Sequence, residues 1–100
     1  MWSAGGMELL STEAIAEFCS SHAEWSYADG ALRATFSARD FPAAIAWVDA
    51  IAVIAEEMDH HPDIDIRWRT LHLALSTHSA GGVTALDTQL ATRIEAVVAS

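Results

Sequence analysis

The sequence has few cysteines, few basic residues and no long apolar run, and each shortage excludes a class of protein. Its single cysteine, Cys19, allows no internal disulfide and suits a reducing compartment such as the cytoplasm. Five Lys+Arg stand against 14 Asp+Glu, so a formal net charge of −9 argues against binding to nucleic acid. The longest apolar run is too short and too rich in alanine to cross a bilayer, so we expect a soluble protein without membrane contact.

The beginning of the chain also lacks the basic and apolar regions of a signal peptide. Residues 1–8, which include two glycines, are predicted to form a flexible N-terminal arm. The remainder, 9–100, has no repeat or linker and has the length of a single domain. Hydrophobic residues make up 52% of the sequence, which is ample for a core and indicates additional apolar surface in a subunit contact.

Periodicity in the first forty residues predicts a helix followed by a hairpin. Ser11 is a capping residue for a helix over 11–20. The dipeptide Asp29-Gly30 is a strong hairpin-turn signal and separates strands expected at 25–27 and 31–37. One face of the second strand is apolar and the other is more polar, as in a sheet with one buried face.

The next predicted helix is apolar nearly all round. Asp40 is its candidate cap, and Pro42 falls in the first turn, where a missing N–H costs nothing. Over 41–55 the only charged side chain is Asp49. We therefore expect one face of this helix on the sheet and the other against a second subunit, in a homodimer or homotetramer. A helix buried entirely within the monomer is the alternative.

The second half of the chain repeats the pattern of two strands and a helix. Alternating residues predict strands over 64–68 and 71–76, and residues 79–82 are expected to form a loop. Thr84 and Asp87 fit an acidic variant of the capping box at the start of the last helix. The element order predicts an α+β fold, with a four-stranded antiparallel sheet and three helices packed on one face.

The end of the long helix carries acids and histidines in one short stretch. Glu56, Glu57 and Asp59 stand at the negative pole of the helix dipole, where each carboxylate costs up to about 1 kcal/mol. Carboxylates and a helix C-terminus both favour the protonated imidazolium of His60 and His61. Side chains in such surroundings are suited to give and take protons.

A third histidine, His78, stands at or just past the end of the last predicted strand. It completes a pocket if that strand pairs close to the turn made by His60, His61 and Pro62. From the residues alone two other interpretations stay open: an exposed helix terminus without function, and a zinc site with water as fourth ligand. Asp87 has a role in the site only if its helix cap borders the pocket.

Several motifs at fixed spacings identify a family. They are Ala-Glu-Glu-Met-Asp-His-His-Pro at 55–62, Leu-Ser-Thr-His at 75–78, and Gly-Val-Thr at 82–84 followed by Asp87. Together with Trp25, they resemble the pterin-4a-carbinolamine dehydratase family over most of the chain, from Trp25 to about Val98. The combination is highly specific. It favours the dehydratase over a zinc site or an exposed helix terminus without function.

The resemblance implies a reaction and its setting. Members are small α+β subunits, usually dimers or tetramers, that dehydrate 4a-hydroxytetrahydropterin to quinonoid dihydropterin without metal. The pterin is then a substrate rather than a cofactor, and the protein is a lyase of tetrahydrobiopterin biosynthesis and recycling. An aromatic amino-acid hydroxylase, which makes this substrate, becomes a candidate partner.

By position, the resemblance assigns catalysis to three histidines. We expect His60 to protonate the leaving hydroxyl, His61 to bind and orient the pterin, and His78 to act as the second acid–base. The residues expected to bind the substrate or support the pocket are Glu56, Asp59, Pro62, Thr77 and Asp87.

The main alternative is a non-enzymatic role through the apolar helix over 41–55. Animal members also serve as dimerisation partners of a transcription factor, and some bacterial relatives without the histidines assist protein assembly. Because this chain keeps all three histidines, a purely non-enzymatic role is disfavoured. The sequence departs from the family pattern at Ile64. Many relatives carry an aromatic residue at this position, which could pack against the flat pterin.

Overall fold

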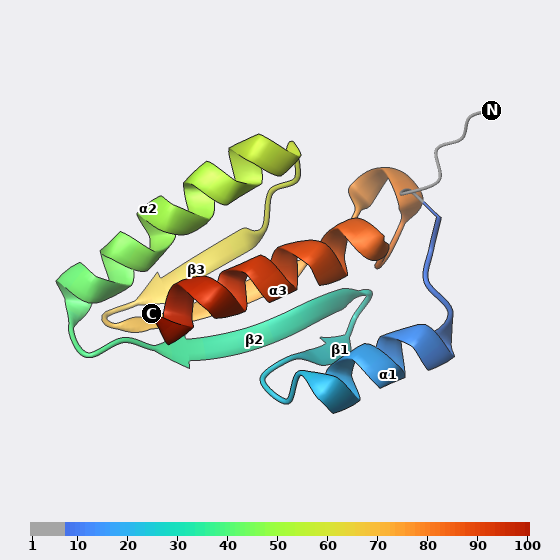
Figure 1. Ribbon diagram of the computed structural model, residues 1–100, viewed down its shortest axis with the longest axis horizontal. Helices are drawn as coiled ribbons and strands as arrows, with labels where there is room; N and C mark the ends of the chain where they lie inside the picture. Colours follow the sequence, from blue (N-terminus) through green and yellow to red (C-terminus); the bar gives the residue numbers. More distant parts are fainter. Residues whose placement is uncertain (1–7) are drawn as a thin grey trace.

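A computed structural model describes residues 8–100 (Figure 1). Apart from its last residue, the predicted flexible arm lies outside the described residues. The observed order of elements is α1 (Thr12–Ser21), β1 (Ser26–Ala28), β2 (Ala31–Ser37), α2 (Phe41–Met58), β3 (Asp63–Arg67), β4 (Thr70–Leu75), η2 (His78–Ala80) and α3 (Ala85–Ala99). The predicted α+β order is confirmed, with one addition: the short 3-10 helix η2 stands where a loop is expected.

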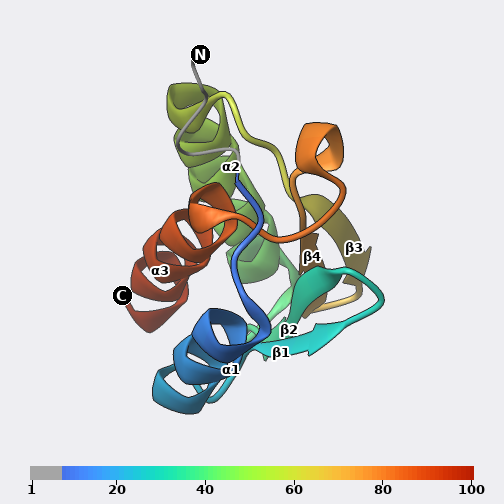
Figure 2. The same cartoon turned by 90° about the vertical axis from the view of Figure 1, so that its right-hand side faces the viewer.

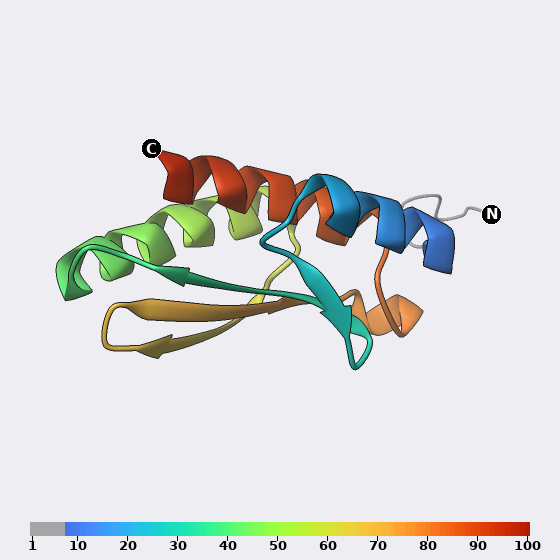
Figure 3. The same cartoon turned by 90° about the horizontal axis from the view of Figure 1, so that it is seen from below.

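The four strands form one antiparallel sheet in the order β1-β2-β4-β3. All three helices lie on the same face of this sheet, and the other face is left open (Figure 3). Viewed from the end, α2 and α3 lie side by side over the sheet, and α1 lies beside them over β1 (Figure 2). The prediction of three helices on one face is therefore confirmed.

The core lies between the sheet and the helices. Each core strand turns alternate side chains inward, as the period of two requires. Every fully buried Leu or Ile contributes about 1.5–3 kcal/mol relative to an exposed position. The largest fully buried apolar side chains are Leu32 on β2, Leu71 and Leu75 on β4, Ile51 on α2, and Leu90 and Ile94 on α3.

Side-chain caps start the first two helices where the sequence predicts them. Ser11 accepts a hydrogen bond from the backbone N–H of Ala14 at 3.0 Å, and Asp40 accepts one from Ala43 at 2.8 Å. Each cap of this kind stabilises its helix by about 1 kcal/mol. Local chemistry therefore sets these two helix starts.

Of the two hairpin turns, only the first has a clear turn signal in the sequence. Asp29 and Gly30 both have positive φ, at 53° and 76°, as a two-residue hairpin turn requires. The turn between β3 and β4 uses Trp68 at φ 56°, a conformation that bulky residues rarely adopt. Trp68 is 74% exposed, and the Arg69 guanidinium lies 5.4 Å from its ring centre.

Helix α2 carries a second apolar surface that the subunit leaves uncovered. Ala44, Ile51 and Ala55 are buried on its inner side. On its outer side Phe41 is 47% exposed and Val53 is 60% exposed. The expected outward apolar surface is present, and the subunit contact over it stays a prediction. Within residues 8–100, no helix is both long and apolar enough to cross a membrane.

Candidate functional site

Two segments far apart in the sequence form a cleft at one end of the sheet. One joins the end of α2 to β3, and the other joins β4 to α3 through η2 (Figures 1 and 2). The cleft has a volume of about 570 Å³, within the usual range of small-molecule sites. Its lining residues are Met58, Asp59, His60, His61, Pro62, Asp63, Ser76, Thr77, His78, Ser79 and Leu86. The three predicted histidines therefore share one cleft.

A tight reversal at the end of α2 separates the two adjacent histidines. Asp59 adopts the left-handed conformation at φ 50° and ψ 44°, which Asp tolerates better than most residues. The N–H of His60 then donates to Ala55 O at 3.0 Å, which closes the helix with a Schellman-type bond. As a result His60 is buried, whereas the side chain of His61 is largely exposed at the rim.

His60 forms a buried pair with the carboxylate of Asp87. Its Nε2 lies 2.6 Å from Asp87 Oδ1, and the exposed fractions of the two residues are 8% and 0%. Asp87 Oδ2 accepts hydrogen bonds from Thr84 N and Thr77 Oγ1, both at 2.9 Å. The carboxylate oxygens of Asp87 act as acceptors in all of these contacts. We conclude that Nε2 of His60 carries the hydrogen.

Asp87 thus has two functions at once. It is the third residue of α3 and closes the capping box with Thr84, as the sequence predicts. The same carboxylate also borders the site through His60. Asp87 is not itself among the lining residues of the cleft and reaches it through His60, so its role in the site stays a prediction.

His61 and His78 have different surroundings. His61 Nε2 lies 2.5 Å from Glu56 Oε2, and both side chains are exposed. An exposed pair of this kind contributes at most about 1 kcal/mol to stability, so its main effect is to orient the ring. His78 begins η2, is exposed, and makes no side-chain hydrogen bond to any residue in 8–100.

The three acids at the end of α2 do three different things. Glu56 pairs with His61. Glu57 instead accepts a hydrogen bond from Arg93 Nη2 of α3 at 2.6 Å. Asp59 ends the helix and lines the cleft. The expectation that all three serve the histidines is wrong for Glu57, because its side chain faces the neighbouring helix.

Several residues of the cleft carry no clear signal in the sequence. Leu86, the second residue of α3, lines the cleft. Its position directly before Asp87 is the one available hint. Ile64, by contrast, is not among the lining residues; it lies on β3 opposite Leu73. The further lining residues that sequence reasoning missed are Met58, Asp63, Ser76 and Ser79.

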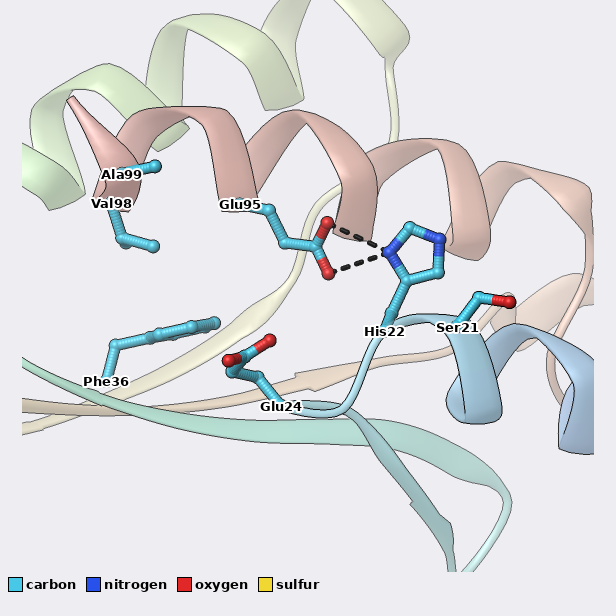
Figure 4. Close-up of a pocket in the computed structure, with 7 residues that line it drawn as sticks. All are labelled: Ser21, His22, Glu24, Phe36, Glu95, Val98 and Ala99. Carbon is cyan, nitrogen blue, oxygen red and sulfur yellow. Dashed lines mark hydrogen bonds and ion pairs between the residues drawn. The ribbon is translucent and has the colours of Figure 1, made fainter.

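A separate hollow of about 390 Å³ lies between the end of α1, β2 and the end of α3 (Figure 4). It contains none of the predicted site residues. Figure 4 shows the His22 ring directed at Glu95, and His22 Nδ1 lies 2.9 Å from both carboxylate oxygens. Phe18 stacks on the same ring at 4.1 Å. These contacts fix the end of α1 against α3, which accounts for His22 structurally.

The histidines of the cleft do not form a metal-binding cluster with other described residues. Within the part of the chain that the structure describes, no three His, Cys, Asp or Glu side chains are placed so that they could hold a metal ion. The adjacent histidines diverge, and His60 already uses one ring nitrogen for Asp87. The expectation of a reaction without metal stays a prediction.

Comparison with known proteins gives a consistent result. The model of the family described as pterin 4 alpha carbinolamine dehydratase matches residues 8–97. The chain belongs to this family. A relative from Nocardia farcinica, named "Putative pterin-4-alpha-carbinolamine dehydratase", is 51% identical over 88% of this chain and 93% of its own length. One of the same name from Roseiflexus castenholzii is 44% identical over 90% of this chain and 97% of its own.

Solved structures agree with this assignment. A transcriptional coactivator/pterin dehydratase from Brucella melitensis matches with a TM-score of 0.88 and 29% identity, over 91% of this chain and 99% of that one. A pterin dehydratase-like protein, described as a RuBisCO assembly factor in the alpha-carboxysome, matches with a TM-score of 0.63 and 22% identity. That second match covers 76% of this chain and 88% of the other, and it shows a shared fold only.

Proposed function

We propose that this protein dehydrates 4a-hydroxytetrahydropterin to quinonoid dihydropterin without metal, using the cleft histidines as acid and base. The observation that carries the proposal is that His60, His61 and His78 line one cleft although they come from distant segments. Membership of a dehydratase family supports a lyase acting on a pterin. The biopterin form of the substrate and the histidine mechanism are our own inferences.

The reaction removes water across the C4a–N5 bond of the pterin. The 4a-hydroxyl leaves as water once its oxygen is protonated, and loss of the N5 proton lets the C4a=N5 double bond form. His60 is the acid in our assignment, because it lines the cleft and its ring is held by the Asp87 carboxylate at 2.6 Å. His78 accepts the N5 proton, since its side chain has no competing partner within residues 8–100.

The remaining cleft residues position the substrate in this proposal. His61 stands at the rim, where Glu56 orients its ring toward a bound pterin. Pro62 fixes the turn, and Leu86 offers an apolar wall. A flat bicyclic ring needs such walls, because small-molecule sites are mostly apolar with a few polar groups that fix orientation.

One assay tests the proposal directly. A hydroxylase generates the 4a-carbinolamine, and formation of the quinonoid product is followed with and without the protein. We expect clear acceleration by the protein and none by the His60→Ala/His78→Ala double variant. No acceleration by the natural protein, or full activity of the double variant, would show that the dehydratase assignment is wrong. Stoichiometric zinc in the purified protein would instead support a zinc-dependent hydratase.

A protein-binding role is the second candidate. One structural relative is described as a transcriptional coactivator as well as a pterin dehydratase. The observation that favours such a role here is the exposed apolar surface of α2, with Phe41, Ile45 and Val53. The same surface suits the contact between subunits of a homodimer or homotetramer, and we propose that a second copy of the chain covers it. A cytoplasmic location and a hydroxylase partner complete the proposal.

A further inference from the structure

A chain of buried hydroxyl groups lies behind His60. Thr77 Oγ1 is 2.7 Å from Thr84 Oγ1 and 2.9 Å from Asp87 Oδ2. Asp87 Oδ1 is in turn 2.6 Å from His60 Nε2. Thr77, Thr84 and Asp87 are all almost completely shielded from solvent. Four side chains from three segments thus form one continuous hydrogen-bonded line that ends at the cleft.

The direction of every hydrogen bond in this line is determined. The ionised Asp87 can only accept, so the single hydroxyl hydrogen of Thr77 points to Asp87 Oδ2. The hydrogen between the two threonines must therefore come from Thr84. Thr84 Oγ1 remains free to accept from Leu86 N at 3.2 Å, as the first residue before α3 should.

These hydrogen bonds leave one oxygen of the Asp87 carboxylate available for His60. Oδ2 of Asp87 is occupied by Thr77 and by the Thr84 N–H, so Oδ1 is the oxygen that receives the imidazole. A donor at Nε2 satisfies Oδ1, whereas the other tautomer would place a lone pair against it. These contacts therefore favour the Nε2–H tautomer of the neutral His60 ring.

The opposite nitrogen of His60, Nδ1, is not used by Asp87. Nδ1 makes no side-chain hydrogen bond with any residue in 8–100. Over the same residues, the only buried side-chain nitrogen or oxygen without a partner is Trp25 Nε1. His60 itself lines the cleft. This nitrogen is the one that can meet a ligand.

We propose that Thr77 and Thr84 are positioning residues that fix His60 in the Nε2–H tautomer, so that Nδ1 is the atom that transfers the proton in the cleft. The inference rests on the proposed dehydratase function for its kinetic part only. The tautomer itself is a property of the protein without substrate. Neither threonine touches the reacting atoms; both act through Asp87.

Thr77 also connects this line to the second acid–base. Its backbone N–H donates to Gly82 O at 2.7 Å, and its carbonyl accepts from the N–H groups of Ala80 and Gly81. These bonds close the loop that carries His78, the next residue in the chain. One buried threonine thus sets the position of the loop with His78 and the hydrogen bonding of His60.

The test combines a structural and a kinetic readout. Nitrogen-15 NMR of histidine-labelled protein, at a pH where the ring of His60 is neutral, reports which ring nitrogen carries hydrogen. We expect Nε2–H at His60 in the natural protein. We expect a mixture of tautomers in Thr77→Val, because Asp87 then loses the hydroxyl that holds its carboxylate in position against His60. In the dehydration assay, Thr77→Val and Thr84→Val should lower kcat about tenfold or more, with KM changed less than about threefold.

Matched variants separate positioning from mere stability. Thr77→Ser and Thr84→Ser keep the hydroxyl and should restore the Nε2–H signal and most of kcat. Thr92→Val removes an exposed hydroxyl of α3 that donates to Thr88 O, and it should change neither readout. Thermal unfolding of each variant shows whether it is folded. If the valine variants do not fold, the natural protein and the serine variants still report the tautomer.

The possible outcomes are distinct. Nδ1–H at His60 in the natural protein, or an unchanged tautomer and kcat in folded Thr77→Val, would overturn this inference. A protein that shows the Nε2–H signal and its loss in Thr77→Val, but does not accelerate dehydration, would contradict the proposed function and leave the tautomer assignment standing.

Discussion

Nε2 of His60 lies 2.6 Å from Oδ1 of Asp87, and both side chains are shielded from solvent although 27 positions separate them in the chain. Asp87 is at the same time the residue that closes the cap of α3. Helix start and candidate site therefore share one carboxylate. A change at Asp87 should consequently affect the stability of the fold and the chemistry of the cleft together.

Asp87→Asn tests this double role. The amide keeps the shape but brings hydrogens against donors from Thr77 and Thr84, so we expect a loss of about 1–3 kcal/mol in the free energy of unfolding. Without the carboxylate the ring of His60 also loses its hydrogen-bond partner, and kcat should fall about 100-fold. Urea unfolding and the dehydration assay measure the two effects. Asp65→Asn, at an exposed pair with Arg67, should change neither by a comparable amount.

The exposed pair of His61 and Glu56 should act on substrate binding. We expect His61→Ala to raise KM several-fold with a smaller effect on kcat, since the residue is assigned to orient the pterin. Glu56→Gln should raise KM in the same direction and change stability by no more than about 0.5 kcal/mol. Glu57→Gln is the matched control, because that neighbouring acid bonds to Arg93 away from the cleft. Equal effects of the two glutamine variants would contradict the assignment.

The outer surface of α2 should hold the oligomer together. Val53→Glu places a charge on the exposed apolar surface and should shift the protein to smaller species in analytical ultracentrifugation. A buried valine contributes about 1.5–3 kcal/mol, so one substitution per subunit is enough to be visible. Ala23→Glu, exposed after α1, should leave the assembly unchanged. A natural protein that is strictly monomeric would refute the expected contact.

Cys19 should react slowly with thiol reagents. Burial raises the pKa of its thiol, because desolvation disfavours the thiolate. The folded state thus holds this proton more tightly than the unfolded state. The resulting stabilisation is present below the unfolded pKa and is lost as the pH rises through the folded pKa. Alkylation by iodoacetamide at mildly alkaline pH should be slower in the folded protein than in urea, and equal rates would contradict this expectation.

Local signals account for much of what could be predicted. Ser11 and Asp40 mark helix starts, and Asp29-Gly30 marks a hairpin, because each acts on backbone groups within a few residues. Alternating apolar residues identify the strands for the same reason. The β3–β4 turn at Trp68 had no such signal, since the sequence there contains no residue that favours positive φ.

The candidate site could be predicted from the sequence only in part. His60, His61 and His78 are recognisable as residue types at family spacings, and the structure brings all three to one cleft. Their different surroundings could not be read from the sequence. Glu57 and Glu56 are neighbours of the same type, yet one faces Arg93 and the other His61.

By itself the sequence determined the order of elements, the helix caps and the residues that carry the chemistry. Those features depend on interactions within one turn of chain, which any local segment already contains. Only the tertiary structure decided that Asp87 meets His60 and that Thr77 and Thr84 stand behind it. Such contacts arise when α2, the β4–η2 link and α3 are packed on one sheet, and no local rule specifies which side chains then face each other.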